Sequence, residues 1–128
     1  MIYLGKIDET IFMSITTDLS TTDVILSDTQ IRHIQAHHPH VFETYCTYLT
    51  QMVESPDYII EANLPNTALL LKSFDEQDKQ FKLILRLQTS GDPVHYKNSV
   101  ITFMKIDGKE WNRLLRNKKV LYKSKNIR

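Results

Sequence analysis

Four apolar runs between Asp57 and Ile106 constrain the fold more than any other feature of the sequence. They read D-Y-I-I-E-A, T-A-L-L-L-K-S-F, F-K-L-I-L-R-L-Q-T and S-V-I-T-F-M-K-I. The turn N-L-P-N, the charged turn D-E-Q-D-K and a longer loop with His95 separate them. Runs of this length between turn residues predict four antiparallel β-strands. Because the runs are apolar on both faces, we expect either covered faces or one face that forms a partly buried cleft.

Polar side chains interrupt these strands at positions that a purely structural core would avoid. They are Lys72, Arg86, Ser99 and Thr102. Strand alternation predicts that Arg86 shares a face with Ile84, whereas Leu85 faces the other side. We therefore treat the four polar residues as candidate site residues.

A short helix with well-marked ends is predicted before the strands. Ser27 and Gln30 form a capping box, which predicts a helix start at about Asp28. Pro39 disfavours helical geometry at His38, so the helix should end there.

Three of the five histidines lie on this helix. Ile31 and Ile34 are predicted to face the core, and His33 and His37 lie on a different stripe. His38 follows Ile31 by seven residues and returns to the apolar stripe. A solvated surface histidine is the ordinary interpretation for His37, and His38 is either hydrogen-bonded and half-buried or a site residue facing a cleft. Imidazole is the side chain best suited to proton transfer near neutral pH.

The flanking segments complete an α+β domain. Residues 41–56 predict a second helix, Trp111 and Leu114 a short C-terminal helix, and K-K-V-L-Y-K a final edge strand. The first twenty residues resemble strand weakly, and this arm either packs on the domain or pairs with a partner. We predict one domain over residues 1–128, with N-terminal helices on a four-stranded antiparallel sheet. Its appendages are an arm at 1–22 and a basic segment at 109–128.

Charge is unevenly distributed along the chain. Residues 109–128 contain eight Lys or Arg and one acid, a net charge of +7, whereas the other 108 residues have a net charge of −6. Such a segment is commonly an electrostatic contact for phosphate, and a solubilising, partly frayed terminus is the alternative.

The sequence gives little support for a nucleotide cofactor or a bound metal ion. With only Gly5, Gly91 and Gly108, neither a P-loop nor a dinucleotide-binding motif can be written. His33 and His37 could share a zinc ion, but no third ligand lies at a motif spacing. We therefore expect no cofactor and no metal.

The single cysteine and the hydropathy suggest a compartment. Cys46 cannot form an internal disulfide, fits a reducing cytoplasm and is expected to fill a small space in the core. No apolar window has the length of a membrane span, and the N-terminus lacks the pattern of a signal peptide. We expect a cytoplasmic protein with no membrane contact.

The remaining chemistry-bearing residues fit RNA cleavage without metal. That reaction needs a base for the ribose 2′ proton, an acid for the leaving 5′ oxygen, and cations for the phosphorane. The residues that match are His33, His38, Lys72, Arg86 and Thr102.

The same segments carry a family resemblance. The runs I-R-H-I-Q-A-H-H-P, S-P-D-Y-I-I-E-A-N-L-P-N-T-A-L-L-L-K, L-I-L-R-L-Q-T, S-V-I-T-F-M-K-I and L-R-N-K-K-V-L-Y-K stand in one order. From about Gly5 to Lys123, the chain resembles the phage-associated barnase–EndoU–colicin–RelE-like nuclease domains of Gram-positive bacteria and their mobile elements. The resemblance implies an N-terminal helical part and a four-stranded antiparallel sheet whose exposed face binds RNA.

By position, the resemblance implies a set of site residues. The family helix pattern H-I-x-x-R-H-P falls on His33, His38 and Pro39, and His37 replaces the family's Arg, which removes one fixed cation. The strand and C-terminal motifs add Asn63, Asn66, Lys72, Arg86, Ser99, Thr102, Arg116, Lys118, Lys119 and Tyr122. Asn66 after Pro65 is also typical of a turn.

We therefore expect a metal-independent ribonuclease that forms a 2′,3′-cyclic phosphate, in a toxin or phage effector. His33, His38, Lys72, Arg86 and Thr102 would be catalytic, and Ser99, Asn66, Arg116, Lys118 and Lys119 would bind substrate. The expected partners are RNA, associated with ribosomes or tRNA, an antitoxin or immunity protein, and a second copy in a homodimer. A non-catalytic RNA- or protein-binding module, a structural phage protein that oligomerises through its arm, and a zinc protein are the alternatives. The ribonuclease interpretation requires that His33 or His38 share one hollow with Arg86.

Overall fold

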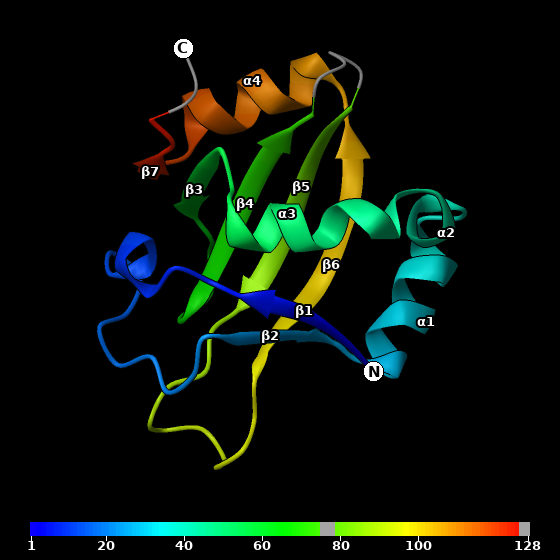
Figure 1. The fold of residues 1–128 in the computed structure, drawn as a ribbon. Coiled ribbons are helices and arrows are strands. Elements are labelled where there is room, and N and C mark those ends of the chain that lie inside the picture. Colours follow the sequence, from blue (N-terminus) through cyan, green and yellow to red (C-terminus); the bar gives the residue numbers. More distant parts are fainter. Residues whose placement is uncertain (75–78, 126–128) are drawn as a thin grey trace.

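The computed structural model describes residues 1–74 and 79–125, in which the strands form one mixed sheet (Figure 1). The order across the sheet is β1-β2-β6-β5-β4-β3-β7. The strands are β1 (Ile2–Lys6), β2 (Asp23–Leu26), β3 (Tyr58–Glu61), β4 (Thr67–Ser73), β5 (Gln80–Arg86), β6 (Asn98–Ile106) and β7 (Val120–Lys123). Strands β2 and β6 pair in parallel, and every other neighbouring pair is antiparallel.

The predicted α+β class is confirmed, and the predicted size of the sheet is wrong. The four expected strands are β3 to β6, and β7 lies at an edge as expected. Strands β1 and β2 extend the opposite edge, which makes the sheet seven-stranded. Residues 9–12 form a 3₁₀ helix, η1 (Glu9–Phe12), where a strand pattern was predicted. Residues 75–78 of the expected charged turn and residues 126–128 of the basic segment lie outside the described residues.

Helix α1 (Asp28–His37) has the predicted ends. Ser27 Oγ accepts from the Gln30 N–H at 3.2 Å, which caps the first turn. The His38 N–H donates to the Ile34 carbonyl at 2.7 Å, and the helix stops before Pro39. The expected second helix is instead broken into α2 (Val41–Tyr45), a 3₁₀ turn η2 (Cys46–Tyr48) and α3 (Leu49–Glu54).

Two hydrophobic clusters occupy the two faces of the sheet. The main cluster joins Ile34 and the helices before β3 to Leu83 and Leu85, and we call its side the inner face. Cys46 packs at its margin, as expected of a small core residue. The smaller cluster lies under α4 (Gly108–Asn117) on the outer face, where Ile84 and Trp111 belong to it. Figure 1 shows α3 and β1 crossing in front of the central strands and α4 at the top of the view.

The N-terminal arm packs on its own domain. Leu4, Ile7 and Phe12 are each at most 4% exposed and belong to the main cluster. Strand β1 has an irregular register at Gly5, whose φ is +113°. A Cβ there would also lie 2.8 Å from Oε2 at the end of the flexible Glu54 side chain, which can move, so the backbone conformation is what requires glycine. No helix within residues 1–74 and 79–125 has the length and apolarity needed to cross a bilayer.

Candidate nucleic-acid interface

A row of five cross-strand partners runs over the outer face of the sheet. Successive partners, from β1 to β4, are Tyr3, Ile25, Ser99, Arg86 and Thr67. Cross-strand partners point to the same face, and neighbouring strands lie about 4.8 Å apart. This cross-strand row therefore brings together side chains from residue 3 to residue 99.

Helix α4 leaves this row accessible. The helix packs on Leu71 and Ile106, which lie toward the other ends of their strands, and Lys82 bonds Glu110 of α4 at 3.3 Å. In the row, Tyr3 is 54% exposed and the Arg86 side chain is 31% exposed. A polar and aromatic strip on one face is thus open to solvent.

Arg86 is held by the loop that follows β5. Its Nη2 donates to Asp92 Oδ1 at 3.0 Å, and its Nη1 donates to the Leu87 carbonyl. The Thr89 N–H bonds the Asp92 carboxylate at 2.8 Å, and this bond, with Arg86, lowers the pKa of Asp92. A guanidinium has five N–H donors, so donors remain for a phosphate after these two contacts.

Buried polar contacts fix both ends of the 89–97 loop. Asn98 is fully buried, and its amide bonds the Gln88 N–H and the Thr21 carbonyl, each at 2.8 Å. Lys97 Nζ lies 2.9 Å from Asp23 Oδ2. The loop is therefore tied to the segment that enters β2.

Asp23 is a meeting point for several side chains. Lys6 Nζ lies 2.6 Å from its carboxylate, and the Tyr3 hydroxyl donates to it at 3.0 Å. The bond from Lys6, followed by those from Lys97 and Tyr3, holds the pKa of Asp23 far below its usual value. Asp23 stays ionised, so it keeps the 89–97 loop beside β1 at any moderate pH.

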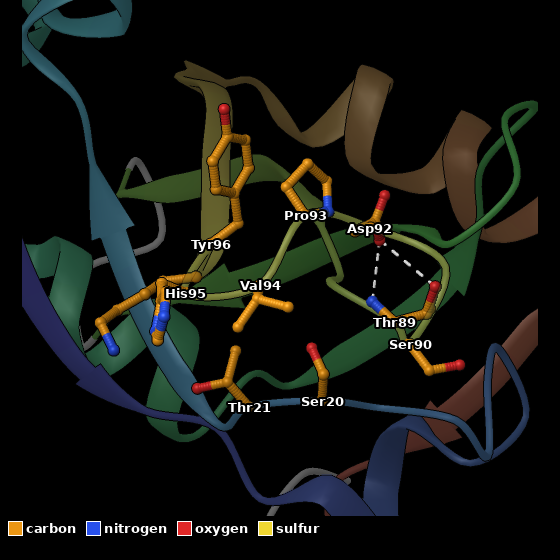
Figure 2. Close-up of a pocket in the computed structure, with 10 residues that line it drawn as sticks. Ser20, Thr21, Thr89, Ser90, Asp92, Pro93, Val94, His95 and Tyr96 are labelled. Atoms are coloured by element: carbon orange, nitrogen blue, oxygen red, sulfur yellow. Dashed lines mark hydrogen bonds between the residues drawn. The ribbon is translucent and has the colours of Figure 1, made fainter.

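His95 lies on this loop between two hollows. Its φ is +75°, a left-handed conformation that is uncommon for residues other than glycine but less so for histidine than for most, and its side chain is exposed. One hollow, of about 340 Å³, has a lining rich in hydroxyl groups (Figure 2). It is lined by Ser20, Thr21, Thr89, Ser90, Asp92, Pro93, Val94, His95, Tyr96 and Lys97. In Figure 2, Val94 points toward Thr21, and Tyr96 points away from it.

The second hollow, of about 330 Å³, lies beside the cross-strand row. It is lined by Met1, Ile25, His95, Tyr96, Lys97 and Ser99. Because Ser99 is the strand partner of Arg86, His95 and Arg86 approach the same stretch of the outer face.

The structure does not bring the α1 histidines to Arg86, which corrects the shared hollow predicted for His33 or His38. Helix α1 buries Ile34 in the main cluster on the inner face, whereas Arg86 alternates with Leu85 and points to the outer face. The His33 and His37 rings lie 4.3 Å apart on the exposed side of α1. The sequence analysis placed His95 only in the loop before the last of the four strands and did not predict it as a site residue. The signal that could have identified His95 is its position in the sequence, between the two candidate site residues Arg86 and Ser99.

Lys72 is also separated from Arg86. It pairs with Phe81 of β5, a main-cluster residue, so it points to the inner face. Its Nζ bonds the Ser55 carbonyl at 2.7 Å and lies 3.4 Å from Asp57 Oδ1. Lys72 thus binds the carbonyl end of α3, and its geometry is that of a structural residue.

Three other predicted residues, Thr102, Asn66 and Lys119, lie near the cross-strand row, at two different places. Thr102 pairs with Ile84 on the outer face, beside the cross-strand row. Asn66 and Lys119 line a third hollow, of about 280 Å³, together with Thr67 of the row. Asn66 has a φ of +53°, as suits a turn residue.

The other two predicted cations of the C-terminal segment are Arg116 and Lys118. Arg116 is exposed on the last turn of α4, and Lys118 Nζ bonds Asn63 Oδ1 at 3.3 Å. Within residues 1–74 and 79–125, no three His, Cys, Asp or Glu side chains gather in a way that could hold a metal ion. His33 and His37 therefore have no third ligand among these residues.

Comparison with known proteins gives one match. The family described as phage-Barnase-EndoU-ColicinE5/D-RelE like nuclease2 matches residues 4–123. No curated protein and no solved structure matches the chain.

Proposed function

The chain belongs to the phage-Barnase-EndoU-ColicinE5/D-RelE like nuclease2 family, and on that premise we propose that it cleaves RNA without metal at the cross-strand row. One observation carries the proposal. His95 and Ser99 line the same hollow, and Arg86 is the strand partner of Ser99. A proton-transfer group, a hydroxyl and a cation therefore meet on one accessible face.

His95 is the residue proposed to move the proton. The five histidines are all among the residues that the structure describes. Of these five, His95 lines the two hollows at the β1 end of the row. Neutral imidazole would take the ribose 2′ proton as the 2′ oxygen attacks phosphorus. The bond from phosphorus to the 5′ oxygen then breaks, water supplies the proton to that oxygen, and a 2′,3′-cyclic phosphate is formed.

Arg86 is proposed to hold the scissile phosphate. Its bond to Asp92 fixes the guanidinium, and its unused donors would stabilise charge on the non-bridging oxygens. Thr102 would orient the same phosphate, and the Ser99 hydroxyl would contact the nucleotide that occupies the adjoining hollow. Lys119, with Asn66 beside Thr67, would contact a phosphate further along the strand.

Single-stranded RNA fits this face better than a duplex does. Exposed aromatic side chains allow unpaired bases to stack, and cations contact the backbone. Tyr3 and Tyr96 are 54% and 62% exposed and lie at the β1 end of the row. Arg86 and Lys97 supply the nearby positive charge.

Cleavage of a fluorescent single-stranded RNA in EDTA tests the proposal. We expect cyclic phosphate ends, and a loss of about 100-fold or more in kcat/KM for His95→Gln and Arg86→Ala. His33→Gln and His38→Gln are matched controls on the inner side and should cleave like the unmodified protein. Cleavage that stops in EDTA, or that survives His95→Gln, would refute the mechanism.

A binding module without catalysis is a second candidate, favoured by one observation. Arg86 of the row and Lys97 of the neighbouring hollow already contact carboxylates, Arg86 at 3.0 Å from Asp92 and Lys97 at 2.9 Å from Asp23. This pairing reduces the charge available to a phosphorane. Binding of RNA that weakens with salt, without any cleavage, would support this candidate.

An effector role is part of the proposal. A nuclease of a mobile element would need a protein inhibitor, an antitoxin or immunity protein, in the cell that makes it. Induced expression in bacteria should arrest growth with the unmodified chain, and His95→Gln should relieve the arrest. Equal growth of both strains would argue against a toxin.

A further inference from the structure

The hollow beside the cross-strand row has an apolar floor and an aromatic wall. Ile25 lies between Tyr3 and Ser99 in the row and forms part of its lining. We propose that this hollow binds one unpaired nucleobase of RNA, stacked on Tyr96. The inference rests on the proposed function for the identity of its ligand as RNA.

Tyr96 is unusually available for stacking. It is 62% exposed, and among the described residues its ring stacks on no other aromatic side chain. Tyr45 and Tyr48, in contrast, pack against Phe81. An exposed ring without a ring partner offers a flat surface of the kind on which bases of single strands stack.

The rim of the hollow matches the polar edge of a base. Ser99 Oγ makes one long bond, 3.4 Å to the Lys97 carbonyl, so the hydroxyl can turn toward a ligand. His95 also lines this hollow. A nucleobase has two apolar faces and an edge of donors and acceptors, which is the combination that this lining can satisfy.

Size and position favour a single base. The volume of about 330 Å³ lies at the lower end of the range for small-molecule sites and has no room for a base pair with its backbones. Arg86 lies one strand away from Ser99, a step of about 4.8 Å. A phosphate at Arg86 and the base of an adjoining nucleotide can therefore be bound together.

Binding of a 2′-O-methyl single-stranded oligonucleotide tests the base site apart from cleavage, because the methyl group blocks attack by the 2′ oxygen. We expect Tyr96→Ala to weaken binding by about 5- to 150-fold, and Tyr96→Phe to bind within about twofold of the unmodified protein. The salt dependence should be unchanged in both variants, since no phosphate contact is lost. Met13→Ala, at a residue 57% exposed directly after η1, is the matched control and should bind normally.

An abasic scan identifies the ligand as a base. Removing the base at one position should weaken binding to the unmodified protein and have no further effect on Tyr96→Ala. Tyr96→Ala binding with unchanged affinity, or Met13→Ala weakening binding equally, would overturn the inference. If the oligonucleotide results hold and RNA is never cleaved, the base site stands and the nuclease proposal fails. If RNA is cleaved and no abasic position matters, the base site is wrong and the nuclease stands.

Discussion

Replacing Lys72 separates the structural role seen here from the catalytic role that its sequence position implied. Lys72→Met keeps the aliphatic stem and removes the ammonium. The variant loses the 2.7 Å bond to the Ser55 carbonyl and the 3.4 Å contact with Asp57. Asp57 would then retain its bond from the Ser73 N–H at 2.8 Å.

The magnitude follows from these contacts and their exposure. A hydrogen bond to a charged group contributes about 1.5–3 kcal/mol, and breaking a fully buried ion pair costs about 3–5 kcal/mol. The Lys72 side chain is 19% exposed and that of Asp57 is 9% exposed, so solvent reduces both effects. We expect Lys72→Met to lower the free energy of unfolding by about 1–2.5 kcal/mol. In urea this is a shift of roughly 0.5–1.5 M in the midpoint.

Urea unfolding followed by fluorescence, with RNA cleavage measured under native conditions, distinguishes the two roles. Cleavage by folded Lys72→Met should stay within about twofold of the unmodified protein, because Lys72 and Arg86 point to opposite faces. Lys105→Met, at an exposed residue of β6, is the control and should change neither quantity. An unchanged urea midpoint with cleavage reduced 100-fold would refute the structural role.

Three further predictions concern other parts of the fold. Hydrogen bonds from Arg113 and then Lys82 hold the pKa of Glu110 at about 2, against an ordinary value of 4.5. The Glu110 carboxylate therefore stabilises the folded state above pH 4.5, and this contribution disappears as the pH falls toward 2. Thermal unfolding between pH 2 and about 6 should show the difference between Glu110→Gln and the unmodified protein growing with pH, and parallel curves would contradict the assignment. Asn98→Ala should cost about 2–4 kcal/mol in urea unfolding, because one buried and one partly buried backbone group lose their partner. It should also raise the KM for RNA by loosening the 89–97 loop. Ser27→Ala should cost about 1 kcal/mol, measured in the same way, through loss of the α1 cap, with no effect on cleavage.

Short-range patterns in the sequence correctly predicted the ends of α1 and the alternation of β5. The capping box and Pro39 set both ends of α1, and alternation in β5 placed Arg86 with Ile84 on one face. These features depend on neighbouring residues and need no knowledge of the tertiary fold. The turn chemistry around Asn66 was predicted for the same reason.

Long-range pairing explains most of what the sequence did not predict. Strand β4 is apolar on both faces, so its pattern does not show which face Lys72 takes; only the register with β5, Lys72 opposite Phe81 and Thr67 opposite Arg86, decides it. The aliphatic residues of β2 resemble a lead-in to α1, and their parallel pairing with β6 joins segments more than 70 residues apart. The face on which α1 packs likewise follows from the fold as a whole. That choice places the α1 histidines on the face of the sheet opposite Arg86.

Because β2 pairs in parallel with β6, the cross-strand row can assemble only late in synthesis of the chain. Val24 and Ile25 find their partners only after Asn98 and Ser99 have left the ribosome. Until then the first two strands have no sheet to join, and the cross-strand row lacks its centre. A chain that ends before Asn98 would therefore carry Arg86 and Tyr3 without joining them in one row.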